Sequence, residues 1–182
     1  MKYYSQAGED LWILENLKPP IGTFCEVGAF DGVMSSNTLL FEELGWTGIC
    51  IEADPFLAAQ CQKNRKAVTW CCAVGMETHG TFYINDQDRG LSGFERPGRP
   101  VQVLIRHLDW LLGYKNVDLL SIDTEGTELE VWLSIGELRP RIVIMEYQTC
   151  NDPPKDKEIV EAMTRSGYVE SRRTPHNIIF TL

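Results

Sequence analysis

The chain has 182 residues, of which 43% are hydrophobic and 24% are charged. This size and composition are typical of one globular domain with a sizeable core, and they exclude a disordered, collagen-like or low-complexity chain. The 26 acidic residues outnumber the 17 basic ones and give a net charge of −9. Such a surface repels phosphate backbones, so nucleic acid and anionic membranes are poor partners, whereas a neutral or cationic small ligand suits this charge.

We expect neither a membrane span nor a secretion signal in this sequence. No apolar run approaches the roughly 18 residues that a transmembrane helix needs, and the first residues lack the basic start and apolar stretch of a signal peptide. The cysteines form no CxxC pair and mostly lie in apolar runs, so we expect reduced, buried cysteines, no zinc site and a cytoplasmic protein. They are Cys25, Cys50, Cys61, Cys71, Cys72 and Cys150.

Short apolar runs alternate with helical periodicity, which is the pattern of βαβ units around a mostly parallel sheet. In chain order we predict a helix at 7–17, a strand at 23–27, a helix at 37–44, a strand at 48–52, a helix at 55–65 and a strand at 68–74. There follow strands at 81–84 and 101–105, a helix at 108–112, a strand at 117–123, a helix at 127–135, a strand at 142–146, a helix at 157–166 and strands at 168–172 and 177–182. The predicted architecture is a single α/β domain with seven core strands, interleaved helices and a C-terminal hairpin.

Two further expectations concern loops and tryptophans. The stretch 87–100 is polar and rich in glycine and proline, which predicts a mobile loop. The five tryptophans lie at core-like positions, and we expect all of them to pack inside; they are Trp12, Trp46, Trp70, Trp110 and Trp132.

A glycine-rich turn follows the first predicted strand in the sequence FCEVGAFDG. Glu26 lies near the end of the strand, and Gly28 and Gly32 let the backbone turn sharply and approach a ligand closely. A dinucleotide site would have a glycine at the position of Phe30, and the carboxylate of Asp31 would repel a diphosphate. S-adenosylmethionine carries a sulfonium and an ammonium instead, so this loop favours a methyl donor over a nicotinamide cofactor.

The second predicted strand ends in the sequence ICIEADP, about one βαβ step after the glycine turn. A carboxylate at this position accepts hydrogen bonds from both ribose hydroxyls of an adenosine, which gives Glu52 a role in cofactor binding. Asp54 is explained as the N-cap of the helix that begins at Pro55.

Three carboxylates follow the apolar strand in DLLSIDTEGTE: Asp123, Glu125 and Glu128. Carboxylates this close repel one another unless a cation lies among them or their pKa values separate. Glu128 is equally suited to the first turn of the next helix, where it complements the helix dipole. Asp123 ends a buried strand and is therefore expected to face the ligand crevice.

Five segments that span nearly the whole chain carry a resemblance to a known family. They are YYSQAGEDLWI (3–13), FCEVGAFDGVMSSNT (24–38), ELGWTGICIEADP (43–55), VDLLSIDTEGTELEV (117–131) and HNIIF (176–180). With these segments in this order, the chain resembles the FkbM-type family of S-adenosylmethionine-dependent methyltransferases. The resemblance implies the class I methyltransferase (Rossmann-like) fold, with a seven-stranded, mostly parallel sheet, an antiparallel C-terminal hairpin and helices on both faces. It also implies methyl transfer to a hydroxyl.

The resemblance further assigns residues to the cofactor. It places Glu26, Gly28 and Asp31 at the methionine part, Glu52 at the ribose and Ala73 beside the adenine. Ser36, Asn37 and Thr38 form the family's SNT stretch, Gln6 belongs to the opening that folds over the cofactor, and Asp123 is expected at both cofactor and acceptor.

A hydroxyl that attacks a methyl group must lose its proton, so we also expect a general base. The candidates are Asp123, Glu146 at the end of the fifth core strand, and His176 beside the hairpin turn. An alternative is that Asp123 and Glu146 hold a divalent cation, Mg²⁺ or Mn²⁺, that acidifies the hydroxyl. Residues expected at the substrate are Glu125, Asn177 and Arg89, whereas His79 and His107 are expected at the surface.

The acceptor expected from the resemblance is a hydroxyl of a sugar, glycan or glycoconjugate. A polyketide or similar metabolite is the second candidate, and a non-catalytic cofactor-binding module is the rival from another class of protein. The chain begins almost at the first motif, so we also expect that it is one domain of a longer protein, with other sugar-modifying domains as candidates for the remainder.

Overall fold

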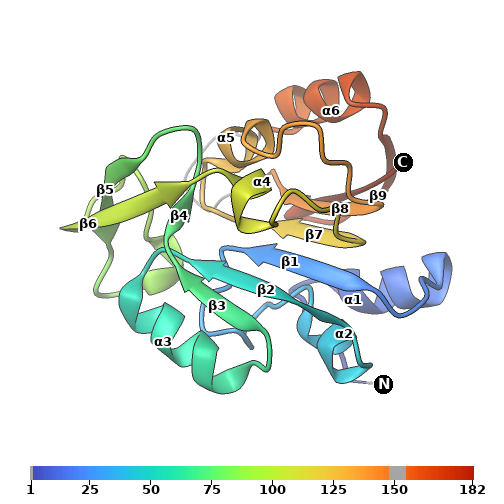
Figure 1. Ribbon diagram of the computed structural model, residues 1–182, viewed down its shortest axis with the longest axis horizontal. Helices are drawn as coiled ribbons and strands as arrows, with labels where there is room; N and C mark the ends of the chain where they lie inside the picture. Colours follow the sequence, from blue (N-terminus) through green and yellow to red (C-terminus); the bar gives the residue numbers. More distant parts are fainter. Residues whose placement is uncertain (1, 148–154) are drawn as a thin grey trace.

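The computed structural model describes residues 2–147 and 155–182. Its centre is a seven-stranded sheet in the order β3-β2-β1-β7-β8-β10-β9 (Figure 1). The first five strands in this order run parallel, and β10 runs antiparallel to both of its neighbours. This confirms the predicted sheet and its antiparallel C-terminal hairpin. The strands are β3 (Val68–Cys71), β2 (Thr47–Glu52), β1 (Thr23–Val27), β7 (Leu119–Ile122), β8 (Ile142–Glu146), β10 (Asn177–Thr181) and β9 (Val169–Arg173).

Helices cover both faces of this sheet, as predicted (Figure 1). One apolar cluster packs the sheet against α4 (Leu108–Leu111), α5 (Glu128–Leu133) and α6 (Asp156–Arg165). A second cluster packs the opposite face against α1 (Glu9–Trp12), a π-helical turn that continues it at Ile13–Leu17, α2 (Leu39–Glu43) and α3 (Pro55–Asn64). The strands between the two clusters are buried on both faces, which is why they appear in the sequence as continuous apolar runs.

A second, smaller sheet was not foreseen in the sequence. It has the order β4-β6-β5 and contains β4 (Ala73–Val74), β6 (Arg99–Arg106) and β5 (His79–Ile84). The predicted strand at 68–74 is therefore two strands, because the chain leaves β2 after Cys71 and pairs with β6 instead. An apolar run does not reveal where a strand changes its partner. The small sheet has its own apolar cluster, with Phe82 and Ile105 among its members.

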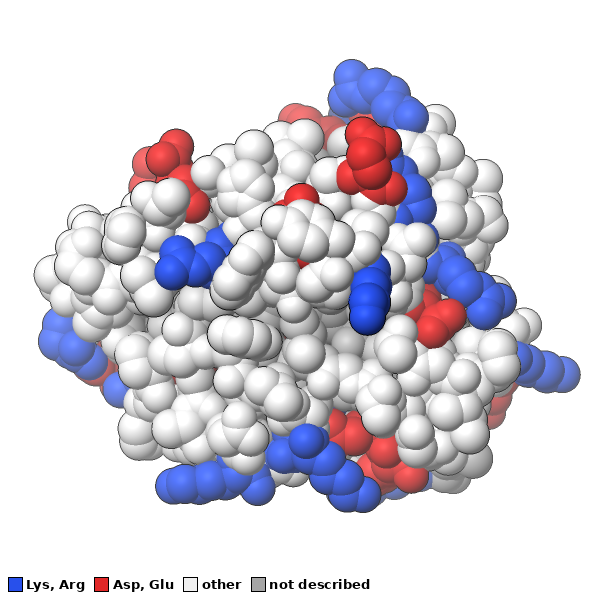
Figure 2. Space-filling view, in the orientation of Figure 1, with Lys and Arg blue, Asp and Glu red and all other residues white. Residues whose placement is uncertain are grey.

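The edge strand β3 corrects two expectations about packing. Trp70 on β3 and Trp110 on α4 are 40% and 48% exposed, and their rings meet edge to face with centroids 6.0 Å apart. Cys71 is exposed as well, while Cys25, Cys50, Cys61 and Cys72 are buried and Cys150 lies outside the described residues. Trp70 and Cys71 are exposed because they lie on β3, which has no outer neighbour in the sheet. Figure 2, in the orientation of Figure 1, shows few charged side chains over the centre of the face turned toward the viewer.

No helix in the described part of the chain is long and apolar enough to cross a membrane.

A buried cluster of charges fixes the glycine turn to the helices around it. The side chain of Arg65, at the end of α3, is fully buried and donates to the carboxylate of Glu26 on β1 at 2.9 Å and to the hydroxyl of Thr38 at 2.9 Å. Its Nε lies 3.4 Å from the carboxylate of Glu42 on α2. Glu42 in turn accepts hydrogen bonds from the backbone N–H groups of Lys66 and Ala67. One guanidinium thus joins β1, α2 and α3.

We expect Arg65→Met to destabilise the protein by about 3–5 kcal/mol, because it leaves two buried carboxylates without their cation. Urea unfolding followed by circular dichroism measures this loss. Arg99→Met is the matched control, since Arg99 pairs with Asp86 at the surface and both are about half exposed; its cost should be at most about 1 kcal/mol. Equal costs for the two substitutions would contradict the importance given to the buried cluster.

Candidate active site

A cleft of about 240 Å³ lies at the carboxyl ends of β1, β2, β7 and β8. In the sheet order, β2 and β7 flank β1 on opposite sides, so the connections diverge at this point. Ligands of open α/β sheets bind at such a switch point. Among the lining residues that the structure describes, six carry carboxylates: Glu26, Glu52, Asp88, Asp123, Glu125 and Glu146.

The cleft brings together most of the site residues expected from the sequence. It is lined by Gln6, Glu26, Gly28, Ser36, Asn37, Glu52, Ala73, Arg89, Asp123, Glu125, Glu146 and His176. Asp31 and Asn177 are not among the lining residues. Asp31 instead closes the glycine turn, where its Oδ1 accepts hydrogen bonds from the N–H groups of Val33 and Met34 at 2.9 and 2.8 Å.

Gly28 is required by the close approach of β1 and β7. Its φ is +80°, and a Cβ atom there would lie 1.6 Å from the carbonyl oxygen of Asp123. Only glycine accepts both the left-handed backbone and the contact. The absence of a Cβ atom therefore lets the backbone of Asp123 lie directly against the turn, and both residues line the cleft.

The carboxylate of Glu26 is occupied by the protein itself. It accepts hydrogen bonds from the hydroxyls of Ser36 and Thr38 and from the N–H of Asn37, and it pairs with Arg65. The cation that Glu26 faces in the structure is thus a guanidinium. Arg65 was missed in the sequence because nothing local marks a residue just after a helix as the partner of a strand 39 residues earlier.

Asn37 offers the cleft a free acceptor. Its Nδ2 donates to the hydroxyl of Ser121 on β7 at 3.0 Å, and its buried Oδ1 has no hydrogen-bond partner within the described residues. A buried acceptor without a donor is costly. The position therefore suits a ligand that brings an N–H group.

Glu52 is held at the end of β2 by two backbone groups. Its two carboxylate oxygens accept from the N–H of Phe30 and the N–H of Asp54, each at 2.8 Å. Burial raises its pKa to about 7, although the backbone hydrogen bonds act in the opposite direction. Each oxygen keeps a further lone pair for a ligand. The neighbouring Asp54 caps α3 through the N–H of Phe56, as the sequence indicated.

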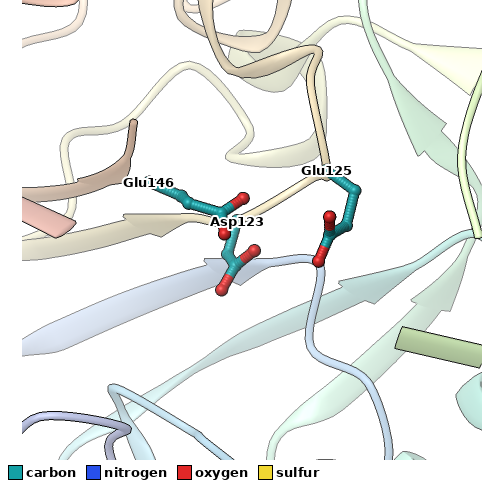
Figure 3. Close-up of side chains that lie close together, drawn as sticks. All are labelled: Asp123, Glu125 and Glu146. Atoms are coloured by element: carbon teal, nitrogen blue, oxygen red, sulfur yellow. The ribbon is translucent and has the colours of Figure 1, made fainter. Parts of the chain in front are cut away.

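Three carboxyl groups lie close together where β7 and β8 end at the cleft. Figure 3 shows Asp123 and Glu146 side by side, with Glu125 approaching from the loop after β7. Oxygens of the three lie within 4.8 Å of one another. Glu128 is not part of this group, because its Oε1 accepts from Thr124 and from the N–H of Gly126 and so closes the turn into α5.

Burial and mutual repulsion separate the pKa values of the carboxyl pair. Burial is the main cause that raises the pKa of Asp123 to about 6. Burial, and then the charge of Asp123, raises the pKa of Glu146 far above its usual range. These shifts favour a pair in which Asp123 is ionised at neutral pH while Glu146 keeps its proton and donates a hydrogen bond to Asp123. The Oε2 atom of Glu146 is buried without a hydrogen-bond partner in the described structure.

His176 reaches the cleft from the turn between β9 and β10. Its carbonyl oxygen accepts from the N–H of Tyr147 at 2.9 Å, which fixes the turn beside the end of β8. Asn177, the next residue, is buried, and its amide donates to Glu9 on α1. His79 is exposed, as expected, whereas His107 is half-buried, with its Nε2 3.2 Å from the carbonyl oxygen of Met76.

Residues of the loop 85–98 form the rim of the cleft. Arg89 pairs with the carboxylate of Asp54 and lies over the ring of Phe56, with 4.6 Å between its guanidinium carbon and the ring centroid. Arg96 donates to the carbonyl oxygen of Glu125 on the opposite wall. The segment that looked mobile in the sequence is therefore anchored at both sides of the cleft.

The sheet order and a cleft at its switch point define a class I methyltransferase. The family model described as a methyltransferase FkbM domain matches residues 26–170, which is most of the chain. The chain therefore belongs to the FkbM methyltransferase family, and the resemblance found in the sequence is confirmed.

Solved structures of other methyltransferases share the fold. A precorrin-6y C5,15-methyltransferase from Geobacter metallireducens is 12% identical with a TM-score of 0.57, covering 100% of this chain and 93% of that one. An RNA methyltransferase homologue from Pyrococcus horikoshii is 15% identical with a TM-score of 0.53, covering 96% and 82%. Magnesium protoporphyrin IX methyltransferase from Synechocystis, solved with bound S-adenosylmethionine, is 13% identical with a TM-score of 0.53, covering 94% and 74%. No curated protein is significantly similar in sequence.

Because the pKa of Glu146 is raised in the folded protein, we expect its contribution to the free energy of unfolding to fall as the pH rises. Above its ordinary value of 4.5 the unfolded chain releases the Glu146 proton while the folded chain keeps it, so the unfolded state binds fewer protons and folding is increasingly penalised. Glu146→Gln cannot ionise, and it should raise the free energy of unfolding at alkaline pH by about 1–3 kcal/mol, with a smaller gain at mildly acidic pH. Urea unfolding at the two pH values measures this.

The control for this experiment is Glu161→Gln on the exposed face of α6, which should change little at either pH. A Glu146→Gln variant that is less stable than the parent at both pH values would show that Glu146 is ionised in the folded protein. Repeating the measurement with a chelator then tests whether a bound cation is the reason.

Proposed function

We propose that the protein is an S-adenosylmethionine-dependent O-methyltransferase that acts on a hydroxyl of a sugar, glycan or glycoconjugate. The observation that carries the proposal is the pairing, in one cleft, of a fixed carboxylate at the end of β2 with an ionised carboxylate at the end of β7. Glu52 suits the ribose of the methyl donor, and Asp123 suits a hydroxyl that must lose its proton. The sugar acceptor is supported by the family resemblance.

The cleft fits S-adenosylmethionine in charge and in hydrogen bonding. Its carboxylates favour a ligand with a sulfonium and an ammonium, and the free Oδ1 of Asn37 can accept from that ammonium. Glu52 would hold the ribose hydroxyls, Ala73 would flank the adenine and Gln6 would lie over the methionine part. Bound S-adenosylmethionine would supply the methyl group. The S-adenosylmethionine found in the Synechocystis enzyme supports this choice of cofactor.

The acidic pair and His176 supply the proton chemistry. Ionised Asp123 accepts the proton of the acceptor hydroxyl, directly or by way of His176, and the proton on Glu146 keeps Asp123 oriented through the hydrogen bond between them. Glu125 and Arg89, which both line the cleft, would bind further hydroxyls of a sugar ring. In the alternative, a Mg²⁺ or Mn²⁺ ion bound by Asp123 and Glu146 acidifies the hydroxyl, and Glu146 is then ionised.

Glu52→Ala should weaken the binding of S-adenosylhomocysteine by roughly 1–3 kcal/mol, because the ribose loses charge-assisted hydrogen bonds. In the parent protein the affinity should also decrease as the pH falls through about 7, since protonation of Glu52 removes the acceptor charge. Isothermal titration calorimetry measures both. Glu77→Ala at the exposed surface is the control, and an unchanged dissociation constant in folded Glu52→Ala would remove Glu52 from the site.

Asp123→Asn and His176→Ala should each lower kcat by roughly 10²- to 10⁴-fold, the usual contribution of a general base, while the affinity for S-adenosylhomocysteine changes little. Because Asp123 must be ionised, kcat/KM of the parent enzyme should rise as the pH increases through about 6. The assay transfers labelled methyl groups from S-adenosylmethionine to a panel of sugars, glycans and polyketides. Near-parental kcat in both variants would place the chemistry elsewhere in the cleft.

The same assay separates the remaining possibilities. Loss of activity with a chelator and recovery with Mg²⁺ or Mn²⁺ would establish the metal alternative, whereas indifference to chelator would leave the base mechanism. Transfer to a polyketide hydroxyl but to none of the sugars would correct the acceptor class. Tight binding of S-adenosylhomocysteine without turnover on any acceptor would identify a non-catalytic binding module.

A further inference from the structure

Glu9 is a wholly buried carboxylate that has no part in the chemistry described so far. It is the first residue of α1, and none of its surface is exposed. Its Oε1 accepts from the hydroxyl of Thr174 at 2.8 Å and from the amide of Asn177 at 3.1 Å, and its Oε2 accepts from the N–H of Ala7 at 2.8 Å. A buried charge persists only when it is hydrogen-bonded in this way. Its partners are therefore informative.

The two partners on Oε1 are the anchor residues of the turn that presents His176. The N–H of Thr174 donates to the carbonyl of Asn177 at 2.8 Å, and the N–H of Asn177 donates to the hydroxyl of Thr174 at 3.0 Å. Pro175 and His176 lie between these anchors. A single carboxylate oxygen thus holds both ends of the four-residue segment that carries His176 into the cleft.

The partner on Oε2 belongs to a segment that is itself fixed. Ala7 follows Gln6, which lines the cleft, and Ser5 forms a bridge with Ser35 of the glycine turn. On the other side, Arg172 of β9 donates to the carbonyl of Gly8 at 3.2 Å. Glu9 therefore connects the His176 turn to a rigid base at the cleft.

Hydrogen bonding keeps this carboxyl charged. Burial alone would raise the pKa of Glu9, but the hydrogen bonds from Thr174, Ala7 and Asn177 together lower it. A charged acceptor forms stronger and more directional hydrogen bonds than a neutral one. The turn is consequently held in one orientation rather than only packed against the core.

We infer that Glu9 is a positioning residue, which sets the imidazole of His176 for proton transfer by fixing Thr174 and Asn177. The inference rests on the proposed function for its catalytic part, because it gives His176 a role in the reaction. Its structural part states that Glu9 on α1 fixes the turn that carries His176, and this part holds whichever acceptor is methylated. Asn177 then belongs to the support of the site, and its amide does not need to contact substrate.

The first test follows the histidine rings directly. The chain has three histidines, so the imidazole signals of histidine-labelled protein are few and that of His176 is assigned by His176→Ala. Glu9→Gln should shift or broaden the His176 signal and leave those of His79 and His107 in place. Thr174→Val removes the same link from its other end and should have the same effect. Tyr168→Phe is the control, since it deletes a different buried hydrogen bond, to the carbonyl of Pro140.

The second test measures catalysis. At saturating acceptor, Glu9→Gln and Thr174→Val should lower kcat by roughly 10- to 100-fold with little change in the KM of the acceptor, as misplacement of a reacting group does. In a His176→Ala background the same substitutions should lower kcat by no more than about twofold, because coupled residues are not additive. Tyr168→Phe should leave kcat unchanged.

The outcomes distinguish this inference from the proposed function. Unchanged His176 signals in folded Glu9→Gln and Thr174→Val would overturn it, and so would a full loss of kcat in the His176→Ala background. A shifted His176 signal in a protein that methylates no hydroxyl would support the structural link and contradict the proposed function. If Glu9→Gln does not fold, Thr174→Val decides alone.

Discussion

The rest of the structure depends on one buried cation. Arg65 neutralises Glu26 and Glu42 in the core, and without it neither β1 nor α2 could keep its acidic residue away from water. The cluster also decides what the turn offers to a ligand. Since Glu26 is satisfied internally, the polar groups left for the cleft on this side are those around it, chiefly the amide oxygen of Asn37. A structural ion pair thus determines the chemistry of the neighbouring site.

The wall of the cleft that carries Asp123 and Glu146 has no such arginine to neutralise its carboxyl groups in the described structure. There Asp123 and Glu146 are crowded without a described arginine or lysine among their partners, and the proton on Glu146 is what allows them to lie together. This arrangement opposes folding, because both groups are buried and one is charged. Proteins accept such costs where a reaction needs the groups. The two walls therefore differ in kind: the acidic groups of one are neutralised by an arginine, whereas those of the other share a proton, as the proposed proton transfer requires.

The sequence analysis correctly predicted the features that depend on residues close together in the chain. The glycine turn and the placement of Glu52 and Asp123 follow from residues next to one another in the chain, whereas the architecture of the sheet was implied by the family resemblance. Contacts between distant residues escaped prediction: Arg65 lies 39 residues from Glu26, and Glu9 lies 168 residues from Asn177. Asn177 was expected at the substrate because only its place beside His176 was visible, not the carboxylate that holds it. The small sheet was missed because pairing, rather than composition, divides the run at Cys72.

The anchored rim has a mechanical consequence for the whole cleft. Asp54 both caps α3 and pairs with Arg89 of the rim, while Arg65 at the other end of the same helix pairs with Glu26 and Glu42. A helix of ten residues is about 15 Å long, so these two sets of contacts lie about that far apart along α3. The rim of the cleft and the buried charge cluster are therefore connected through the two ends of one helix. A substitution at either end of α3 changes the support of the cleft from a place that the cleft itself does not contain.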